Sequence, residues 1–501
     1  MKTKLESQSA AQQSSTLSEL LVSALVTPVR AMRLRYLPLL MIYFAYGALG
    51  LISVAENFWV KETLTLNPAD LAALGVWVTL PWTIKMVFGQ FVDSIPLFGS
   101  QRRIYVFLGA GLIAFGILQL WAAASAFQTI VAPDTAYIIA SITIVIGFVI
   151  QDVGADAMST EVVDRTYPDG SPRPDDDVKR DLGIVQVLGR LALTFGAFAV
   201  AGIAGWIAQV LSYETVFLLG LTIPLISLLG AMFVRLDPVP SKEVDWRILG
   251  GGLAFGVVVL GIGIGGIPFG QEIVFLVSMI VVCTMLVRVI ADLDPKTKQR
   301  IFFAALIIFA FRAMPGTGDG YTWFSIDVLG FDEAFFGILG QIGMGLAMAG
   351  TWLLSDTITR RPVTQILFWL TIIGSLFMLP NVALVFGIHE WTNAQFGIGP
   401  RTIALVDTAL GSPFAQLSMI PLLTLIAVHA PAGRRATWFA LMASLMNLAL
   451  VAGQLQTKYL NTSFQISRGQ YDDLPGLIVT VAIVGLVVPI LVILLVGKRV
   501  E

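Results

Sequence analysis

Charged side chains of both signs lie at a similar depth inside three apolar segments of the sequence. Lys85, Asp152 and Arg190 are each about seven or eight residues from one segment end, roughly 10–12 Å along a helix. A charge at the centre of a bilayer costs roughly 2.5–3.5 kcal/mol on insertion scales, so such residues usually face a cavity and have partners. Asp156 lies one helical turn from Asp152, and Gln186 lies one turn from Arg190. We expect a polar layer in which Asp152 or Asp156 takes up a proton.

This polar layer has two interpretations. In the first, Lys85 holds the carboxylate of Asp152 or Asp156 while it is ionised, and the layer handles substrate or protons. In the second, the charges form a static network that locks three helices together. Both roles are compatible, because a charge network that opens is a gate.

The second half of the chain offers one deep cation, Arg312, and several neutral candidates. Residues 314–320 contain one proline and three glycines, which predict a broken transmembrane helix, although a helix end followed by a loop is the alternative. Backbone freed by such a break must face protein or water. Four further residues are candidates for stacking on, or hydrogen bonding to, a planar ligand: Tyr321, Trp323, Gln341 and Asn447. The aromatic pair would equally suit the interfacial belt of a membrane protein.

A separate motif follows the second apolar segment, at the end nearer Lys85. Gly89 and Asp93 precede the pair Arg102 and Arg103. A small residue lets helices approach closely, and opposite charges can then lock their ends. We expect a structural and gating role here.

Membrane-spanning helices must position all of these residues. The composition is 56% hydrophobic and 13% charged. Apolar stretches of about 20 residues, enough to cross a hydrocarbon core, recur along the whole chain. Lipid offers the backbone no hydrogen-bond partners, so each stretch must be a helix. We expect fourteen spans, at 37–60, 70–92, 103–126, 135–160, 181–210, 213–235, 249–267, 271–291, 301–324, 333–355, 363–387, 402–429, 434–457 and 475–497.

The basic residues sort to one side of these spans. Of the 31 Lys and Arg residues, 24 fall in the tails and loops of one side, four on the other side and three within spans. The positive-inside rule makes the richer side cytoplasmic, with both termini and the loop 164–181 there. We expect an integral protein of a bacterial inner membrane. Residues 1–36 form a cytoplasmic tail, of which 17–37 is either disordered or an amphipathic helix on the membrane surface.

The spans divide into six, two and six. Residues 37–235 and 301–501 form two halves with local resemblance around their first spans, the pattern of a secondary transporter with a central site. Residues 236–300 form a linker that carries two glycine-rich extra helices, which we interpret as a structural insertion. The sequence has no Gly-Lys-Ser/Thr phosphate motif and no His/Cys ligand cluster, so we expect no enzyme activity, cofactor, metal or nucleic-acid partner.

Several motifs resemble the folate-biopterin transporter family, a branch of the major facilitator superfamily. They are the stretch 80–85 ending in Lys85, the loop 93–99 with its following arginine pair, the acidic helix 152–156, and shorter matches at 329–337 and 431–441. The resemblance implies an all-α membrane fold with two six-helix halves, here with two inserted central helices.

The same resemblance implies transport of a folate or pterin, with protons in symport. We expect Arg190 and Arg312 to offset the polarity of this cargo, with Asp319 and Asp407 the next candidates for proton coupling. Two alternatives remain: a transporter of another small organic solute, and a non-transporting membrane scaffold or assembly factor related to pigments or tetrapyrroles.

Overall fold

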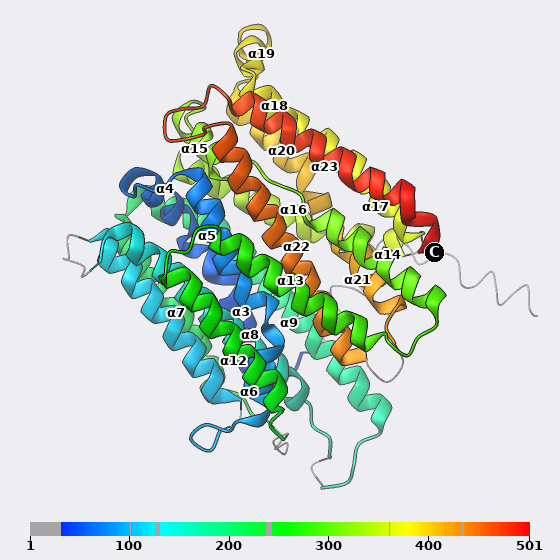
Figure 1. Cartoon of the computed structure of the whole chain (residues 1–501). Helices are drawn as coiled ribbons and strands as arrows, with labels where there is room; N and C mark the ends of the chain where they lie inside the picture. Colours follow the sequence, from blue (N-terminus) through cyan, green and yellow to red (C-terminus); the bar gives the residue numbers. More distant parts are fainter. Residues whose placement is uncertain are drawn as a thin grey trace, which may run out of the picture.

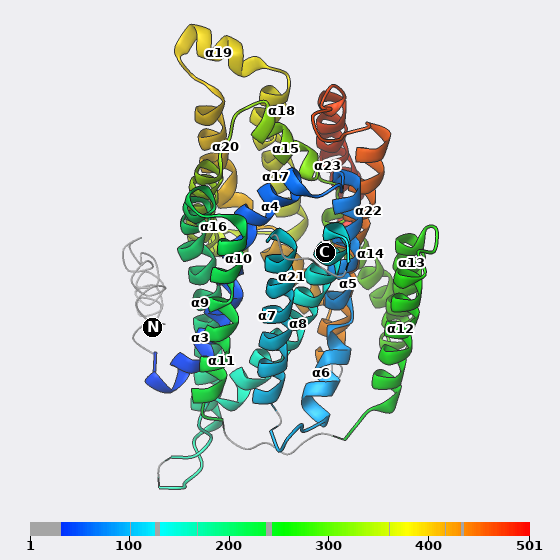
Figure 2. The same cartoon turned by 90° about the vertical axis from the view of Figure 1, so that its left-hand side faces the viewer.

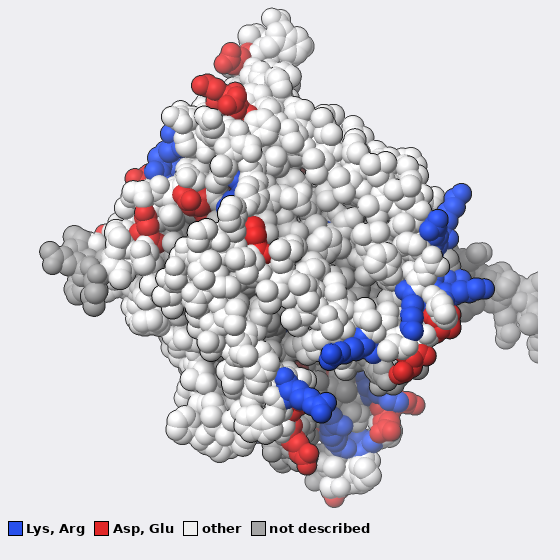
Figure 3. All heavy atoms as spheres, viewed as in Figure 1, with Lys and Arg blue, Asp and Glu red and all other residues white. Residues whose placement is uncertain are grey.

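The computed structural model is a bundle of long helices with a wide uncharged belt. It describes residues 32–100, 102–125, 131–167, 169–236, 243–359, 361–415, 417–431 and 435–500. Basic side chains gather at the lower-right end of the molecule, mixed with acidic ones, whereas acidic side chains predominate at the upper left, with an almost uncharged surface between the two ends (Figure 3). Such a belt suits a protein whose middle contacts lipid. The expected N-terminal tail lies largely outside the described residues.

The first six expected spans are all helical. The first is divided by a short 3-10 turn at Leu49–Ile52, and the second and sixth are each made of two helices. The helices of this N-terminal half are α3 (Leu37–Ala48), α4 (Ser53–Thr63), α5 (Pro68–Thr83), α6 (Lys85–Ser94), α7 (Arg103–Ala124), α8 (Pro133–Glu161), α9 (Asp175–Val210), α10 (Tyr213–Gly220) and α11 (Thr222–Phe233).

Helix α9 starts earlier than the expected residue 181. With 36 residues it is roughly 54 Å long, well beyond the thickness of a hydrocarbon core. Its first turn contains three consecutive acids, which suit the positive end of a helix dipole.

The last six spans form the C-terminal half, and three of them, 301–324, 363–387 and 402–429, are each divided into two helices. Thirteen helices of the described chain are long and apolar enough to cross a membrane. The remaining expected span, 301–324, is made of two shorter helices, as its proline and glycines predict. The helices are α14 (Pro295–Arg312), α15 (Asp319–Asp327), α16 (Glu333–Thr359), α17 (Val363–Phe377), α18 (Leu379–Val385), α19 (Ile388–Phe396), α20 (Pro400–Ala415), α21 (Met419–Val428), α22 (Arg435–Ser463) and α23 (Leu474–Val496).

Two helix pairs join the halves. Helix α9 packs along α16, and α5 packs along α22 (Figure 1). Glycines make the first contact close: a Cβ on Gly205 would lie 2.6 Å from the Cα of Gly337. Because Gly205 is near the end of α9 and Gly337 is near the start of α16, the two helices meet most tightly toward the acidic end of the molecule.

The two extra helices stand at the edge of the bundle. Helices α12 (Trp246–Ile264) and α13 (Gly270–Val289) form a hairpin on its outer surface (Figure 2). Helix α12 packs against α6 of one half, and α13 packs mainly against α22 of the other. Lys458 of α22 binds Glu272 of α13 at 2.8 Å. The hairpin therefore lies beside the seam between the halves.

Candidate functional site

Lys85 joins the carboxylates of the expected polar layer. Its Nζ lies 2.5 Å from Oδ2 of Asp152 and 2.9 Å from Oδ2 of Asp156. The Tyr43 hydroxyl donates to the other oxygen of Asp156 at 3.1 Å. Both carboxylates lie on α8, one turn apart, as their spacing predicts. We call Lys85, Asp152, Asp156 and Arg190 the inner polar layer.

A helix break places Lys85. Pro81 inside α5 removes a backbone donor, and the helix ends at Thr83, so that Lys85 is the first residue of α6. The carbonyl of Trp82 at this break accepts a hydrogen bond from the amide of Asn447, on α22 of the other half, at 3.0 Å. The break therefore positions Lys85 and also provides a hydrogen bond between the halves.

The inner polar layer is open to solvent. The Lys85 and Asp156 side chains are 37% and 48% exposed, whereas Asp152 is only 12% exposed. Arg190 and Gln186 are exposed on α9, and the Gln186 amide donates to the Ser159 hydroxyl at 2.6 Å. Arg190 forms no ion pair with any described residue. Exposed charges this deep in a span indicate a water-filled space.

Three aromatic rings cover the inner polar layer on its other side. The ring of Tyr46 lies 5.1 Å from that of Phe148 and 6.3 Å from that of Trp82, centroid to centroid. Phe148 is one turn from Asp152 on α8, and Trp82 is one turn from Lys85. We call Tyr46, Trp82 and Phe148 the aromatic layer.

Beyond the aromatic layer lies a cavity of about 320 Å³ between the two halves. Its wall includes Phe148, Tyr137 and Glu56 from the N-terminal half, and Asp319 and Trp323 from α15 of the C-terminal half. We call it the outer cavity. A second cavity of about 270 Å³, lined by α3, α4, α9, α15 and α16, adjoins it at Asn57. The sequence analysis named Asp319 as a further candidate for proton coupling, but it did not predict this cavity.

Arg312 is a cation without a carboxylate partner among the described residues. Its Nη1 contacts the sulfur of Met419 at 3.1 Å, and its Nε is buried with no hydrogen-bond partner. A buried donor left unpaired is costly. Arg312 therefore has spare hydrogen-bonding capacity, as the sequence-based assignment to an anionic ligand requires.

The break after Arg312 is held by polar side chains of α22. The Gln456 amide donates to the Ala313 carbonyl at 2.6 Å, and the Thr457 hydroxyl accepts from the Gly316 amide at 2.9 Å. The Asn461 amide donates to the Thr317 carbonyl at 3.2 Å. Backbone groups freed from helical pairing thus find partners inside the protein, as a broken span requires.

The other candidates of the C-terminal half lie apart from each other. Trp323 faces the outer cavity and is 1% exposed. Tyr321 donates instead to the Asn381 side chain at 2.6 Å, within its own half. A Cβ on Gly202 of α9 would lie 2.0 Å from the amide oxygen of Gln341, so Gln341 packs in the contact between α9 and α16. Asn447, as described, lies at the break in the second span. The structure therefore does not bring these four residues around one point.

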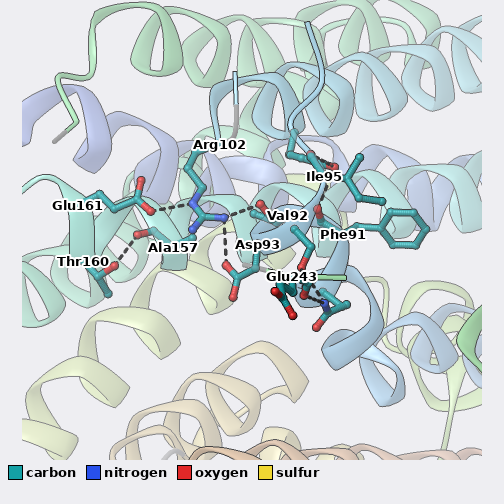
Figure 4. A network of polar contacts seen from close by, with 12 residues as sticks. Phe91, Val92, Asp93, Ile95, Arg102, Ala157, Thr160, Glu161 and Glu243 are labelled. Carbon is teal, nitrogen blue, oxygen red and sulfur yellow. Dashed lines mark hydrogen bonds and ion pairs between the residues drawn. The ribbon is translucent and has the colours of Figure 1, made fainter. Parts of the chain in front are cut away.

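The motif after the second span forms a network within the N-terminal half (Figure 4). Arg102 lies 2.8 Å from Glu161 and 3.0 Å from Asp93, and it also donates to the Val92 carbonyl. The side chain is 6% exposed, so this pairing is shielded from solvent. The network ties α6 and α8 to the start of α7.

The other two residues of that motif, Arg103 and Gly89, do not form the close contact between helix ends that the sequence predicted. Arg103 donates to the Val234 carbonyl at 2.6 Å, again within the N-terminal half. A Cβ on Gly89 would meet nothing within 4 Å. The close approach expected at Gly89 is thus absent from this conformation.

At the opposite end, polar contacts cross between the halves. Lys61 of α4 lies 2.5 Å from Asp327 of α15. Arg468 donates to the carbonyls of Val60 and Leu66 at 3.3 and 3.4 Å, and its guanidinium lies 4.9 Å from the Trp323 ring. We call these contacts the outer closure, because they lie at the ends of helices beyond the outer cavity.

No group of three or more His, Cys, Asp or Glu residues in the described part of the chain could hold a metal ion.

Known relatives are similar in sequence to this chain over most of its length. The folate-biopterin transporter of Synechocystis sp. is 28% identical over 454 residues, which cover 88% of this chain and 78% of the relative. Probable folate-biopterin transporter 4 of Arabidopsis thaliana is 23% identical, with 87% and 89% covered. Among solved structures, a peptide transporter POT in complex with sulfate superposes with a TM-score of 0.62 at 16% identity, covering 93% of this chain and 94% of the other, which shows a common fold.

A family model extends this similarity over almost the whole sequence. The model of the BT1 family matches residues 47–501, which include both halves and the extra hairpin. The motif resemblance seen in the sequence is thereby confirmed, and a membrane transporter is favoured over a non-transporting scaffold. The chain belongs to the BT1 family and is a multi-pass membrane transporter rather than an enzyme.

Proposed function

We propose that the protein moves a folate- or pterin-like solute by alternating access, driven by protons. The cargo class is supported by the relatives, which are named as folate-biopterin transporters. The sorting of basic residues supports cytoplasmic termini and a bacterial inner membrane location. The acidic end with the outer closure then faces outward.

The conformation supports the alternating-access part of the proposal. The outer closure joins the halves on the external side, while the inner polar layer is exposed. We interpret this as a state open to the cytoplasm. In the opposite state, Lys61 and Asp327 separate, and the open surface at Gly89 is the natural place for the C-terminal half to approach.

The single observation that carries the proton-coupling proposal is the bridge from Lys85 to two carboxylates. Lys85 contacts two carboxylates that lie one turn apart on α8, and one of these two carboxyl groups, on Asp152 or Asp156, is the proposed proton carrier. Protonation removes one of the attractions that hold Lys85 and loosens α6 from α8. The proton would thus change the contacts between helices that line the pathway.

Arg190 and Arg312 complete the proposed substrate site. Each is a cation from a different half, and neither has a carboxylate partner among the described residues. An anionic cargo would supply the missing charge, with planar carboxylates matching guanidinium geometry. Cargo binding to both would draw the halves together.

Uptake by protein reconstituted in liposomes tests the proposal. Wild type should accumulate folate or biopterin under an inwardly directed proton gradient, with the more acidic solution outside the liposomes. Asp152→Asn or Asp156→Asn should abolish this accumulation, while exchange without a pH gradient survives. Asp176→Asn, an exposed carboxyl on the same side, is the matched control and should behave as wild type.

If both variants retain full gradient-driven uptake, the first-half carboxylates are structural. If wild type transports neither compound but moves another organic solute, the proposed cargo class is wrong while the transporter assignment stands.

A further inference from the structure

Two carboxyl groups from opposite halves face the outer cavity. Glu56 comes from α4 of the N-terminal half, and Asp319 is the first residue of α15, just after the break in the ninth span. The proposed proton and anion sites use neither of them. Acidic side chains inside a membrane protein are costly and usually mark a pathway.

No described cation neutralises this pair. Neither residue forms an ion pair with any described residue, and both line the outer cavity together with Tyr137. The nearby cations are engaged elsewhere: Lys61 binds Asp327, and Arg468 holds backbone carbonyls and covers Trp323. The carboxyl oxygens therefore offer acceptors to whatever enters the cavity.

The walls of the outer cavity suit a flat ring. Trp323, Tyr137 and Phe148 contribute aromatic side chains, while Asn57 and Ser141 add small polar groups. Its volume of about 320 Å³ lies at the lower end of the range typical of small-molecule sites, roughly 300–1,000 Å³. A bicyclic heterocycle fits this description better than a long flexible chain.

We propose that the outer cavity binds the heterocyclic end of the cargo, through adjacent ring N–H and amino groups that donate to Glu56 and Asp319. An aminopyrimidinone ring presents such neighbouring donors along one edge, and an ionised carboxylate accepts two of them at once. The inference rests on the proposed function, because that function supplies a cargo containing this ring.

The second cavity extends from the proposed ring site along the helix that carries Arg190. Ala197 of α9 lines it, and Arg190 lies seven residues farther inward on the same helix, roughly 10 Å along the axis. A cargo with its ring in the outer cavity and an anionic tail pointing inward would place the tail near Arg190. The two ends of the cargo are then recognised by groups of opposite charge.

Calorimetric binding of two cargo fragments to the purified full-length protein tests this division. Pterin carries the ring alone, and p-aminobenzoyl-glutamate carries the tail alone. Glu56→Gln and Asp319→Asn should each weaken pterin binding about tenfold or more, and leave p-aminobenzoyl-glutamate binding unchanged. Glu62→Gln is the matched control, because it lies on the same helix, binds Tyr213 and does not line the cavity. Thermal unfolding verifies that each variant is folded.

The outcomes separate this inference from the proposed function. Unchanged pterin affinity in both variants overturns the inference, even when the pH dependence of uptake changes, since the pair then binds protons only. An equal loss of affinity for both fragments also contradicts the inference, because the ring and the tail are then not recognised by separate groups. Failure of wild type to bind pterin, folate and biopterin overturns the proposed function and this inference together.

Discussion

Removing Lys85 should destabilise the protein more than removing Lys85 and Asp152 together. Lys85→Ala leaves two carboxylates one turn apart with no cation between them. Asp152→Ala alone is milder, because Lys85 keeps Asp156 at 2.9 Å. The double variant lacks both the cation and the more buried carboxylate, so its remaining charge, Asp156, is the better solvated one.

The burial of the pair sets the expected magnitude. Exposed ion pairs contribute about 0.2–1 kcal/mol, whereas losing one partner of a buried pair costs about 3–5 kcal/mol. Lys85 is 37% exposed and Asp152 is 12% exposed, which places the pair between these limits. We expect a coupling free energy of about 2 kcal/mol between the two residues.

A double-mutant cycle measures this coupling, with the free energy of unfolding obtained by reversible denaturation in mixed detergent micelles. The control pair is Lys179 and Asp176, at 3.6 Å on the surface, where both side chains are largely exposed. Its coupling should stay below about 0.5 kcal/mol. A Lys85–Asp152 coupling equally small, or a double variant less stable than Lys85→Ala, would refute the reasoning.

Three further predictions concern the outer closure, the topology and the extra hairpin. Lys61→Asp should weaken the outer closure and slow transport, and adding Asp327→Lys should restore the transport rate, because the ion pair forms again with reversed charges. If the transport rate is not restored, the pair is not a gate. In a background without the native cysteine, a membrane-impermeant thiol reagent should label a cysteine at Ser463 but not at Ser171 in intact cells; the reverse pattern would invert the orientation. Replacing residues 249–291 by a flexible linker should leave a folded protein with some ligand binding, because the hairpin packs at the edge of the bundle. Complete loss of folding, measured by size-exclusion chromatography, would contradict the interpretation of the hairpin as an insertion.

Much of the architecture follows from residue patterns. Hydropathy and the sorting of basic residues predicted the spans, because the bilayer requires both a fixed length and a helical backbone. Depth counting brought Lys85 and the two carboxylates of α8 together, since charges at one depth have few other ways to be satisfied. The break in the ninth span was predicted as well, from its proline and glycines.

Contacts that depend on helix rotation were beyond prediction. Tyr321 and Trp323 are two residues apart, yet they face different sides of α15, because a helix turns about 200° over two residues. Gln341 appeared to be a ligand candidate, but it fills space against Gly202 in a contact between the halves. The outer cavity could not be foreseen, because it requires the relative placement of α4, α5, α8 and α15.

The aromatic layer also determines where an electrical force would act on transported charge. Because the inner polar layer is exposed, the membrane voltage falls mainly across the part of the protein beyond it, which begins at Tyr46, Trp82 and Phe148. A charge carried through this part experiences most of the voltage, worth about 2.3 kcal/mol per elementary charge for each 100 mV. The net charge of cargo plus proton therefore decides whether a cell's resting potential assists the movement, opposes it or leaves it unaffected.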